Sequence, residues 1–156
     1  MTPFTGTVWR ILFAAYADEP VAPARAPEGR FRHDGQLATY TSLSAEGAGT
    51  AIQRYLTPDD PPRVIISLTV SLERVLDLRG DMPAKDSVPP TSVVWQDQRA
   101  VGLRASTWDI SDRAITLGAQ GILYRSRTHP ALHHLVLLGP TNPNVLSVLG
   151  PVRPWP

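Results

Sequence analysis

The stretch from Gly29 to Gly49 places side chains that could bind an anion around a turn and a short strand. In chain order they are Arg30, Arg32, His33, Tyr40 and Glu46, with the turn signal Asp34–Gly35 in the middle. Arginine binds phosphate or carboxylate through paired, charge-assisted hydrogen bonds, and a tyrosine ring can stack on a flat ligand. The same pattern is also typical of a solvated turn followed by a core tyrosine, and the residue types leave both interpretations open.

Two further polar residues lie in or at the end of apolar segments. Arg10 lies within VWRILFA, and Ser126 ends GILYRSR between two arginines. A buried arginine needs an anionic partner because an isolated buried charge is costly. Alternatively, the head group of Arg10 reaches water, and Ser126 is one of the polar residues that commonly end a strand and has no binding role. Ser42 alternates with Tyr40, so both would lie on one face of their strand.

Several kinds of site are disfavoured by the sequence. There is no cysteine, which excludes thiolate catalysis and cysteine-based metal centres. His133 and His134 are adjacent and would point to opposite faces of a strand, so we expect no metal site. Neither a phosphate-binding loop nor a GxSxG elbow is present. The formal net charge of +1 argues against direct nucleic-acid binding.

The elements that must position these residues follow from hydrophobic periodicity. The sequence predicts strands over residues 8–14, 38–42, 64–72 (continuing through 74–79), 121–127 and 132–138. A helix over 45–56 would begin after the cap Ser44, and a second over 106–120 would carry Asp109 in a capping-box position. The segment 91–103 is ambiguous, and the tail from Gly139 is expected to follow the surface without regular structure.

The composition indicates one globular domain. The chain has 156 residues, with 42% hydrophobic and 19% charged residues, which is enough for a sizeable core. No secretory signal or membrane-spanning run is recognisable, so we expect a cytoplasmic protein with no membrane partner. The summed pattern predicts an α+β fold: a single domain with a twisted, mainly antiparallel sheet and flanking helices.

Three of these segments together resemble the RES-domain family, the toxins of bacterial RES–Xre toxin–antitoxin pairs. They are WRI around Arg10, GRFRHDGQLATYTSLSAEGA from Gly29, and GAQGILYRSR ending near Ser126. Each motif alone is weakly specific, but their order matches the family over most of the chain. The resemblance is therefore to one RES-like domain spanning residues 1–156.

This resemblance implies an ADP-ribosyltransferase-like fold and an enzyme that consumes NAD as its substrate, without a metal. It implies a toxin that cleaves the nicotinamide–ribose bond and transfers ADP-ribose to a cellular protein. Depletion of NAD by a glycohydrolase or phosphorylase is the alternative activity. Its implied partners are an antitoxin of the Xre type that covers the NAD pocket and a protein acceptor of ADP-ribose.

The resemblance also implies roles for particular residues. By matching position it implies that Arg10, Arg30, Tyr40 and Ser126 bind NAD, and we add His33 and Ser42 to this binding set. Arg30, Tyr40 and Glu46 are the catalytic candidates. The family's usual acid lies on the helix after the tyrosine strand, where this chain has Ala51 or Gln53, so Glu46 would have to replace it. The missing acid also leaves open a non-catalytic module that binds a nucleotide or a partner.

Overall fold

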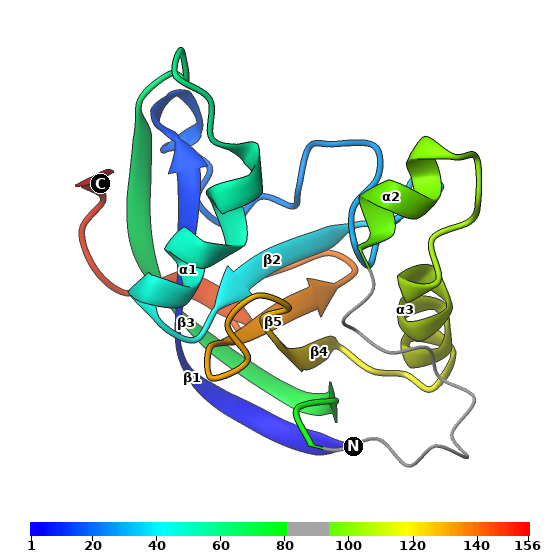
Figure 1. The fold of residues 1–156 in the computed structure, drawn as a ribbon. Helices are drawn as coiled ribbons and strands as arrows, with labels where there is room; N and C mark the ends of the chain where they lie inside the picture. Colours follow the sequence, from blue (N-terminus) through cyan, green and yellow to red (C-terminus); the bar gives the residue numbers. More distant parts are fainter. Residues whose placement is uncertain (81–93) are drawn as a thin grey trace.

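The computed structural model describes residues 1–80 and 94–156, which form a curved sheet with α-helices packed beside it (Figure 1). The strands are β1 (Thr2–Phe13), β2 (Ala38–Ser42), β3 (Arg63–Asp77), β4 (Gly121–Arg125), β5 (His133–Leu138), β6 (Leu146–Val148) and β7 (Arg153–Trp155). The helices are α1 (Ala45–Ile52), α2 (Trp95–Ala100) and α3 (Thr107–Thr116), with short 3-10 turns at Ala14–Tyr16 and Gln53–Tyr55.

Five of the strands close into a ring. β1 pairs with β2 at Trp9 and Ser42, β2 with β5, β5 with β4, β4 with β3, and β3 again with β1. The two long strands, β1 in blue and β3 in green, run together in Figure 1. Among the described pairs only β3–β4 is parallel. The expected twisted, mainly antiparallel α+β fold is therefore confirmed.

The second edge of β3 explains an error in the sequence prediction. β3 pairs along most of its length with β1, and its other edge pairs in succession with β7, β6 and β4. The tail after Gly139 was expected to lack regular structure, but it supplies β6 and β7. An unpaired strand edge leaves backbone donors and acceptors without partners, so the tail gains hydrogen bonds by covering it.

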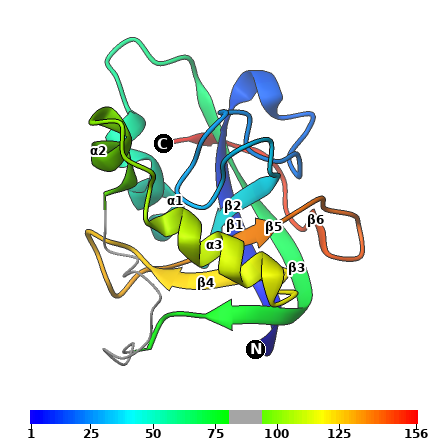
Figure 2. The same cartoon turned by 90° about the vertical axis from the view of Figure 1, so that its right-hand side faces the viewer.

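Apolar side chains pack on both faces of β4 and β5. Leu123, Leu135 and Leu137 face a cluster with Val8 and the buried residues of β3. The alternating residues Ile122, Tyr124 and Val136 face a second cluster with Phe31 and the α3 residues Ile110 and Ala114. Strands that are buried on both faces read as continuous apolar runs, as these two do. Figure 2 shows α3 lying in front of β4 and β5.

The helix starts test two capping predictions. Ser44 caps α1, because its hydroxyl oxygen accepts the Gly47 N–H at 2.9 Å, as expected. The capping box of Ser106 and Asp109 is wrong. The Ser106 hydroxyl binds the Gln98 side chain and caps nothing. Asp109 instead accepts a hydrogen bond from Arg104.

The ambiguous segment 91–103 contains α2, while its residues 91–93 lie outside the described residues. Within the ranges 1–80 and 94–156, none of the helices has the length and apolar character needed to cross a bilayer.

Candidate functional site

A cavity of about 580 Å³ is lined by residues of β1, the segment 24–30, β2, α1, the start of α2, β4 and the residues after it, and β5. Four of the residues predicted for the site line it: Arg10, Arg30, Tyr40 and Ser126. Its volume lies within the range of about 300–1,000 Å³ that is typical of small-molecule sites. The structure therefore brings together residues from three distant parts of the sequence.

Arg30 is the most unusual residue of this cavity. Its Nε and Nη2 atoms are buried and have no hydrogen-bond partner among the described residues. The guanidinium lies 5.0 Å from the centre of the Tyr124 ring and 5.6 Å from that of Phe31. Burial lowers the pKa of Arg30, and the neighbouring Tyr124 only partly opposes this effect. A buried cation with free donors is suited to an anionic ligand.

Tyr40 ties β2 to the segment that carries Arg30. Its hydroxyl oxygen accepts the backbone N–H of Phe31 at 2.9 Å. Burial raises the pKa of Tyr40 above its usual range, so the phenol stays protonated at neutral pH. A Cβ added at Gly29 would lie 2.6 Å from the same hydroxyl, so only glycine allows this close approach.

Three polar side chains lie side by side across strands β2, β5 and β4. Ser42, His134 and Tyr124 are register partners on β2, β5 and β4, and His134 and Tyr124 line the cavity. The Ser42 hydroxyl lies 2.8 Å from Nδ1 of His134. Burial and, to a lesser extent, Arg30 lower the pKa of His134 to about 4. His134 is therefore neutral at physiological pH, and Ser42 reaches the cavity only through this histidine.

Arg10 on β1 and Ser126 after β4 line other parts of the cavity. Arg10 is buried and donates to the carbonyl oxygen of Pro20 at 2.9 Å. Burial, and then the charge of Arg25, lower the pKa of Arg10 to about 10. Ser126 follows β4, and its hydroxyl accepts the backbone N–H of His129 at 3.2 Å. Both side chains are thus held in place by the chain itself.

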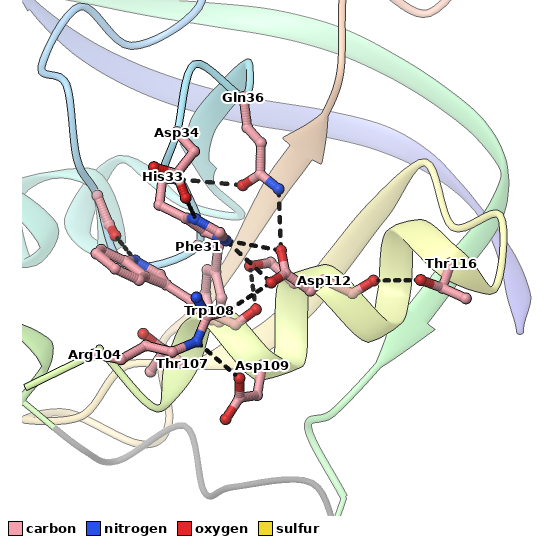
Figure 3. Close-up of polar contacts among 12 residues, drawn as sticks. Phe31, His33, Asp34, Gln36, Arg104, Thr107, Trp108, Asp109, Asp112 and Thr116 are labelled. Carbon is pink, nitrogen blue, oxygen red and sulfur yellow. Dashed lines mark hydrogen bonds and ion pairs between the residues drawn. The ribbon is translucent and has the colours of Figure 1, made fainter.

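Helix α3 fixes the backbone that carries Arg30 (Figure 3). The indole N–H of Trp108 donates to the carbonyl oxygen of Gly29 at 2.8 Å. The Thr107 hydroxyl donates to the carbonyl oxygen of Arg30. Because neighbouring carbonyls bind two adjacent helix residues, the position of Arg30 depends on where α3 packs.

We expected His33 to bind the ligand, but it packs against α3 and does not line the cavity. Its ring stacks on Trp108 at a centroid distance of 4.7 Å. Its Nδ1 and Nε2 lie 2.6 Å from Asp34 and 2.9 Å from Asp112. Arg32 is also buried and donates to the carbonyl oxygen of Gln36 at 2.6 Å. The basic turn is therefore a packed structural feature with only Arg30 facing the cavity.

The structure does not bring Glu46 to the cavity. Glu46 is exposed in the first turn of α1 and is not among the lining residues. Ala51 and Gln53, where the family resemblance expects an acid, do line the cavity. The helix therefore faces the site as expected, but neither position supplies a negative charge.

Among the lining residues that sequence reasoning did not assign to the site, Glu28, Tyr124 and His134 bear most on its chemistry. Tyr124 precedes Ser126 by two residues, and this spacing alone could have placed it on the same strand face. His134 was considered only as a metal ligand. Its pairing with Ser42 depends on strand register, which the sequence does not state. The described residues hold no cluster of three or more possible metal ligands.

Comparison with known proteins assigns the chain to a class. The family model described as the RES domain matches residues 7–156, so the chain belongs to the RES domain family. No curated protein sequence matches it.

Among solved structures, a similar one is the crystal structure of the Mycobacterium tuberculosis MbcT–MbcA toxin–antitoxin complex. The matched chain is 18% identical, with a TM-score of 0.67, and the alignment covers 99% of this chain and 86% of that one. At this identity the likeness confirms the fold.

Proposed function

We propose that the chain is an NAD-consuming toxin that cleaves the bond between nicotinamide and ribose. The observation that carries this proposal is that Nε and Nη2 of Arg30, at a cavity of about 580 Å³, are buried and have no hydrogen-bond partner within residues 1–80 and 94–156. The pyrophosphate of a dinucleotide would supply anionic oxygens that accept hydrogen bonds from these nitrogens. Membership of the RES domain family supports the same substrate.

The lining residues fit the parts of NAD. Arg30 and Arg10 bind the pyrophosphate oxygens through charge-assisted hydrogen bonds. Tyr40 offers an aromatic face to the nicotinamide ring, and Ser126 offers a hydroxyl to the carboxamide or a ribose hydroxyl. Among the described residues, four arginines line the cavity, namely Arg10, Arg30, Arg54 and Arg127, so the wall is suited to a doubly charged pyrophosphate.

The reaction breaks one bond and forms one. The C1′–N bond of the nicotinamide ribose breaks, and its electron pair neutralises the pyridinium nitrogen as nicotinamide leaves. The ribose acquires oxocarbenium character, as in glycoside hydrolysis. A nucleophile then bonds to C1′ and loses its proton to solvent. A protein side chain, water or phosphate can serve as this acceptor, giving a transferase, a glycohydrolase or a phosphorylase respectively.

We further propose a protein antitoxin as the partner that restrains the toxin. The similar solved structure is that of a toxin–antitoxin complex, which supports such a pairing for this chain. An antitoxin that covers the cavity would exclude NAD and would explain how the producing cell survives.

The test is nicotinamide release from NAD labelled in the adenylate part, using purified chain with and without cell lysate and with and without phosphate. We expect release from the wild type and a loss of about 100- to 1,000-fold in Arg30→Met, the cost typical of removing one preorganised charged group. Arg153→Met is the matched control, because Arg153 is exposed on β7 and does not line the cavity.

The label identifies the acceptor. Label on a protein band that requires lysate indicates a transferase, free ADP-ribose a glycohydrolase, and ADP-ribose 1″-phosphate a phosphorylase. Saturable NAD binding without any nicotinamide release would overturn the enzymatic proposal in favour of a binding module.

A further inference from the structure

Among the described residues that line the cavity, Glu28 is the one carboxylate. It directly precedes Gly29 and Arg30, so it lines the cavity beside Arg30, two of whose buried nitrogens have no hydrogen-bond partner among the described residues. The charged side chains around it in the lining are all arginines. In the part of the lining that the structure describes, Glu28 is thus the one residue that can oppose a positive charge that develops inside the cavity.

The proposed reaction needs such a group. Positive charge grows on the ribose as the C1′–N bond breaks, and a nearby carboxylate lowers the energy of that transition state. Ala51 and Gln53 on the α1 wall have no charge, and Glu46 is exposed outside the lining. Without Glu28, four lining arginines would make the departure of nicotinamide harder.

The backbone beside Glu28 is fixed before any ligand binds. The Gly29 N–H donates to the carbonyl oxygen of Arg32 at 2.9 Å, and the Gly29 carbonyl accepts the Trp108 indole N–H at 2.8 Å. Phe31 donates to Tyr40 at 2.9 Å. A group held in this way can stabilise charge without reorganising during the reaction, which is the condition for effective electrostatic catalysis.

One oxygen of Glu28 is oriented by α2. Nε of Arg99 donates to Oε2 at 3.0 Å, and the Arg99 guanidinium lies 5.0 Å from the Trp108 ring centre. Within residues 1–80 and 94–156, no hydrogen bond occupies Oε1. Both side chains are only about one-third exposed. Arg99 therefore leaves one carboxylate oxygen available to a ribose hydroxyl or to the C1′ region.

We propose that Glu28 is the catalytic carboxylate of this chain and stabilises the ribosyl cation as nicotinamide leaves. This inference rests on the proposed function. Glu28 forms no covalent bond in the step: the C1′–N electron pair goes to nicotinamide, Glu28 faces the cation, and the acceptor nucleophile closes C1′. Arg99 is a positioning residue that acts through Glu28.

The experiment compares nicotinamide release by Glu28→Gln, Glu28→Asp, Arg99→Gln and Glu73→Gln. The neutral glutamine keeps an oxygen that can accept from Arg99, so Glu28→Gln removes the charge with little change in packing. Aspartate keeps the charge but shortens the side chain. Glu73 is an exposed carboxylate on β3 outside the cavity and is the matched control. Binding of ADP-ribose and thermal unfolding are measured for each variant.

We expect Glu28→Gln to lower kcat by about 100- to 1,000-fold while the Kd for ADP-ribose stays within about threefold. Glu28→Asp should recover part of that loss, Arg99→Gln should lose at most about tenfold, and Glu73→Gln should match the wild type. A Glu28→Gln variant that keeps its turnover overturns the proposal. The proposal is also overturned if Glu28→Gln and Arg99→Gln both lose ADP-ribose binding and thermal stability, because that result indicates that the pair is purely structural.

Glu46→Gln tests whether Glu46, the other candidate carboxylate, is needed for turnover. Loss of turnover in Glu46→Gln with retention in Glu28→Gln would overturn the proposal and leave NAD cleavage intact. No release by the wild type would overturn the proposed function itself, together with the role of Glu28. The two failures are therefore distinguishable.

Discussion

The Tyr40 hydroxyl oxygen accepts the backbone N–H of Phe31 at 2.9 Å, and this contact joins the strand face of the cavity to the segment that carries Arg30. Phe31 and Tyr40 are nine residues apart in the sequence, and the turn around Asp34 and Gly35, whose tip is exposed, lies between them. The contact places an aromatic ring and a guanidinium on the same cavity wall. It is therefore the geometrical basis of the proposed site.

Tyr40→Phe tests this contact directly. The variant leaves the N–H of Phe31 without its partner, which costs about 1–3 kcal/mol for a buried donor. We expect the free energy of unfolding, measured by urea titration, to fall by this amount. Tyr16→Phe is the control because Tyr16 is exposed and its hydroxyl binds nothing among the described residues. Equal stability of the two variants would show that the contact contributes nothing.

Gly29→Ala tests the same contact from the other side. A Cβ at Gly29 would lie 2.6 Å from the Tyr40 hydroxyl, so either the ring or the Arg30 segment must move. We expect loss of nicotinamide release by at least about tenfold, because small misplacements of a binding group are costly. At Gly6 an added Cβ meets only ordinary contacts, the nearest at 3.6 Å, so Gly6→Ala is the control. An active Gly29→Ala variant would contradict the requirement for close approach.

Arg30→Met separates binding from stability. The Nε and Nη2 atoms of Arg30 have no partner among the described residues, so the folded protein bears the cost of burying a charge. We expect the variant to lose NAD cleavage while its Tm stays the same or rises by about 2–4 °C, equivalent to about 1 kcal/mol. Differential scanning calorimetry measures this. A clear fall in Tm would mean that Arg30 has a structural role.

His33 predicts a pH dependence of stability. Burial alone would lower its pKa, but hydrogen bonds to Asp34 and Asp112 outweigh burial and raise the pKa above its ordinary value of 6.5. The charged ring therefore stabilises the folded state fully below pH 6.5. This contribution is lost as the pH rises through the higher folded-state pKa.

Urea unfolding at several pH values on either side of about 6.5 measures this contribution. We expect the wild type to lose stability with rising pH relative to His33→Gln. Parallel pH profiles for the two proteins would contradict a stabilising role of protonated His33 bound to Asp34 and Asp112.

Local patterns predicted the strands well. The strand 38–42 has the expected bounds, and Ile66, Leu68, Val70 and Leu72 are buried as their alternation indicates. Such patterns arise within one strand and need no knowledge of its neighbours. β1 was predicted to begin at Val8 but begins at Thr2, because pairing with β3 extends it beyond its apolar run.

Features that depend on distant partners were harder to predict. The tail forms β6 and β7 only because β3 offers a free edge. Asp109 does not cap α3 because Arg104 binds it. In the site, Arg30 and Tyr40 were recognisable from their motif. Glu28 lines the cavity because of the path of the loop before β2, and His134 because of the register between β5 and β2. Neither is visible in a local sequence pattern.

The central claim is that Arg30 holds an anionic dinucleotide for cleavage at the nicotinamide–ribose bond. Release of nicotinamide from NAD by the purified chain, compared between wild type and Arg30→Met, tests it most directly. The account predicts turnover by the wild type and a loss of about 100- to 1,000-fold in the variant. Equal release by both proteins, or no release by the wild type, would contradict it.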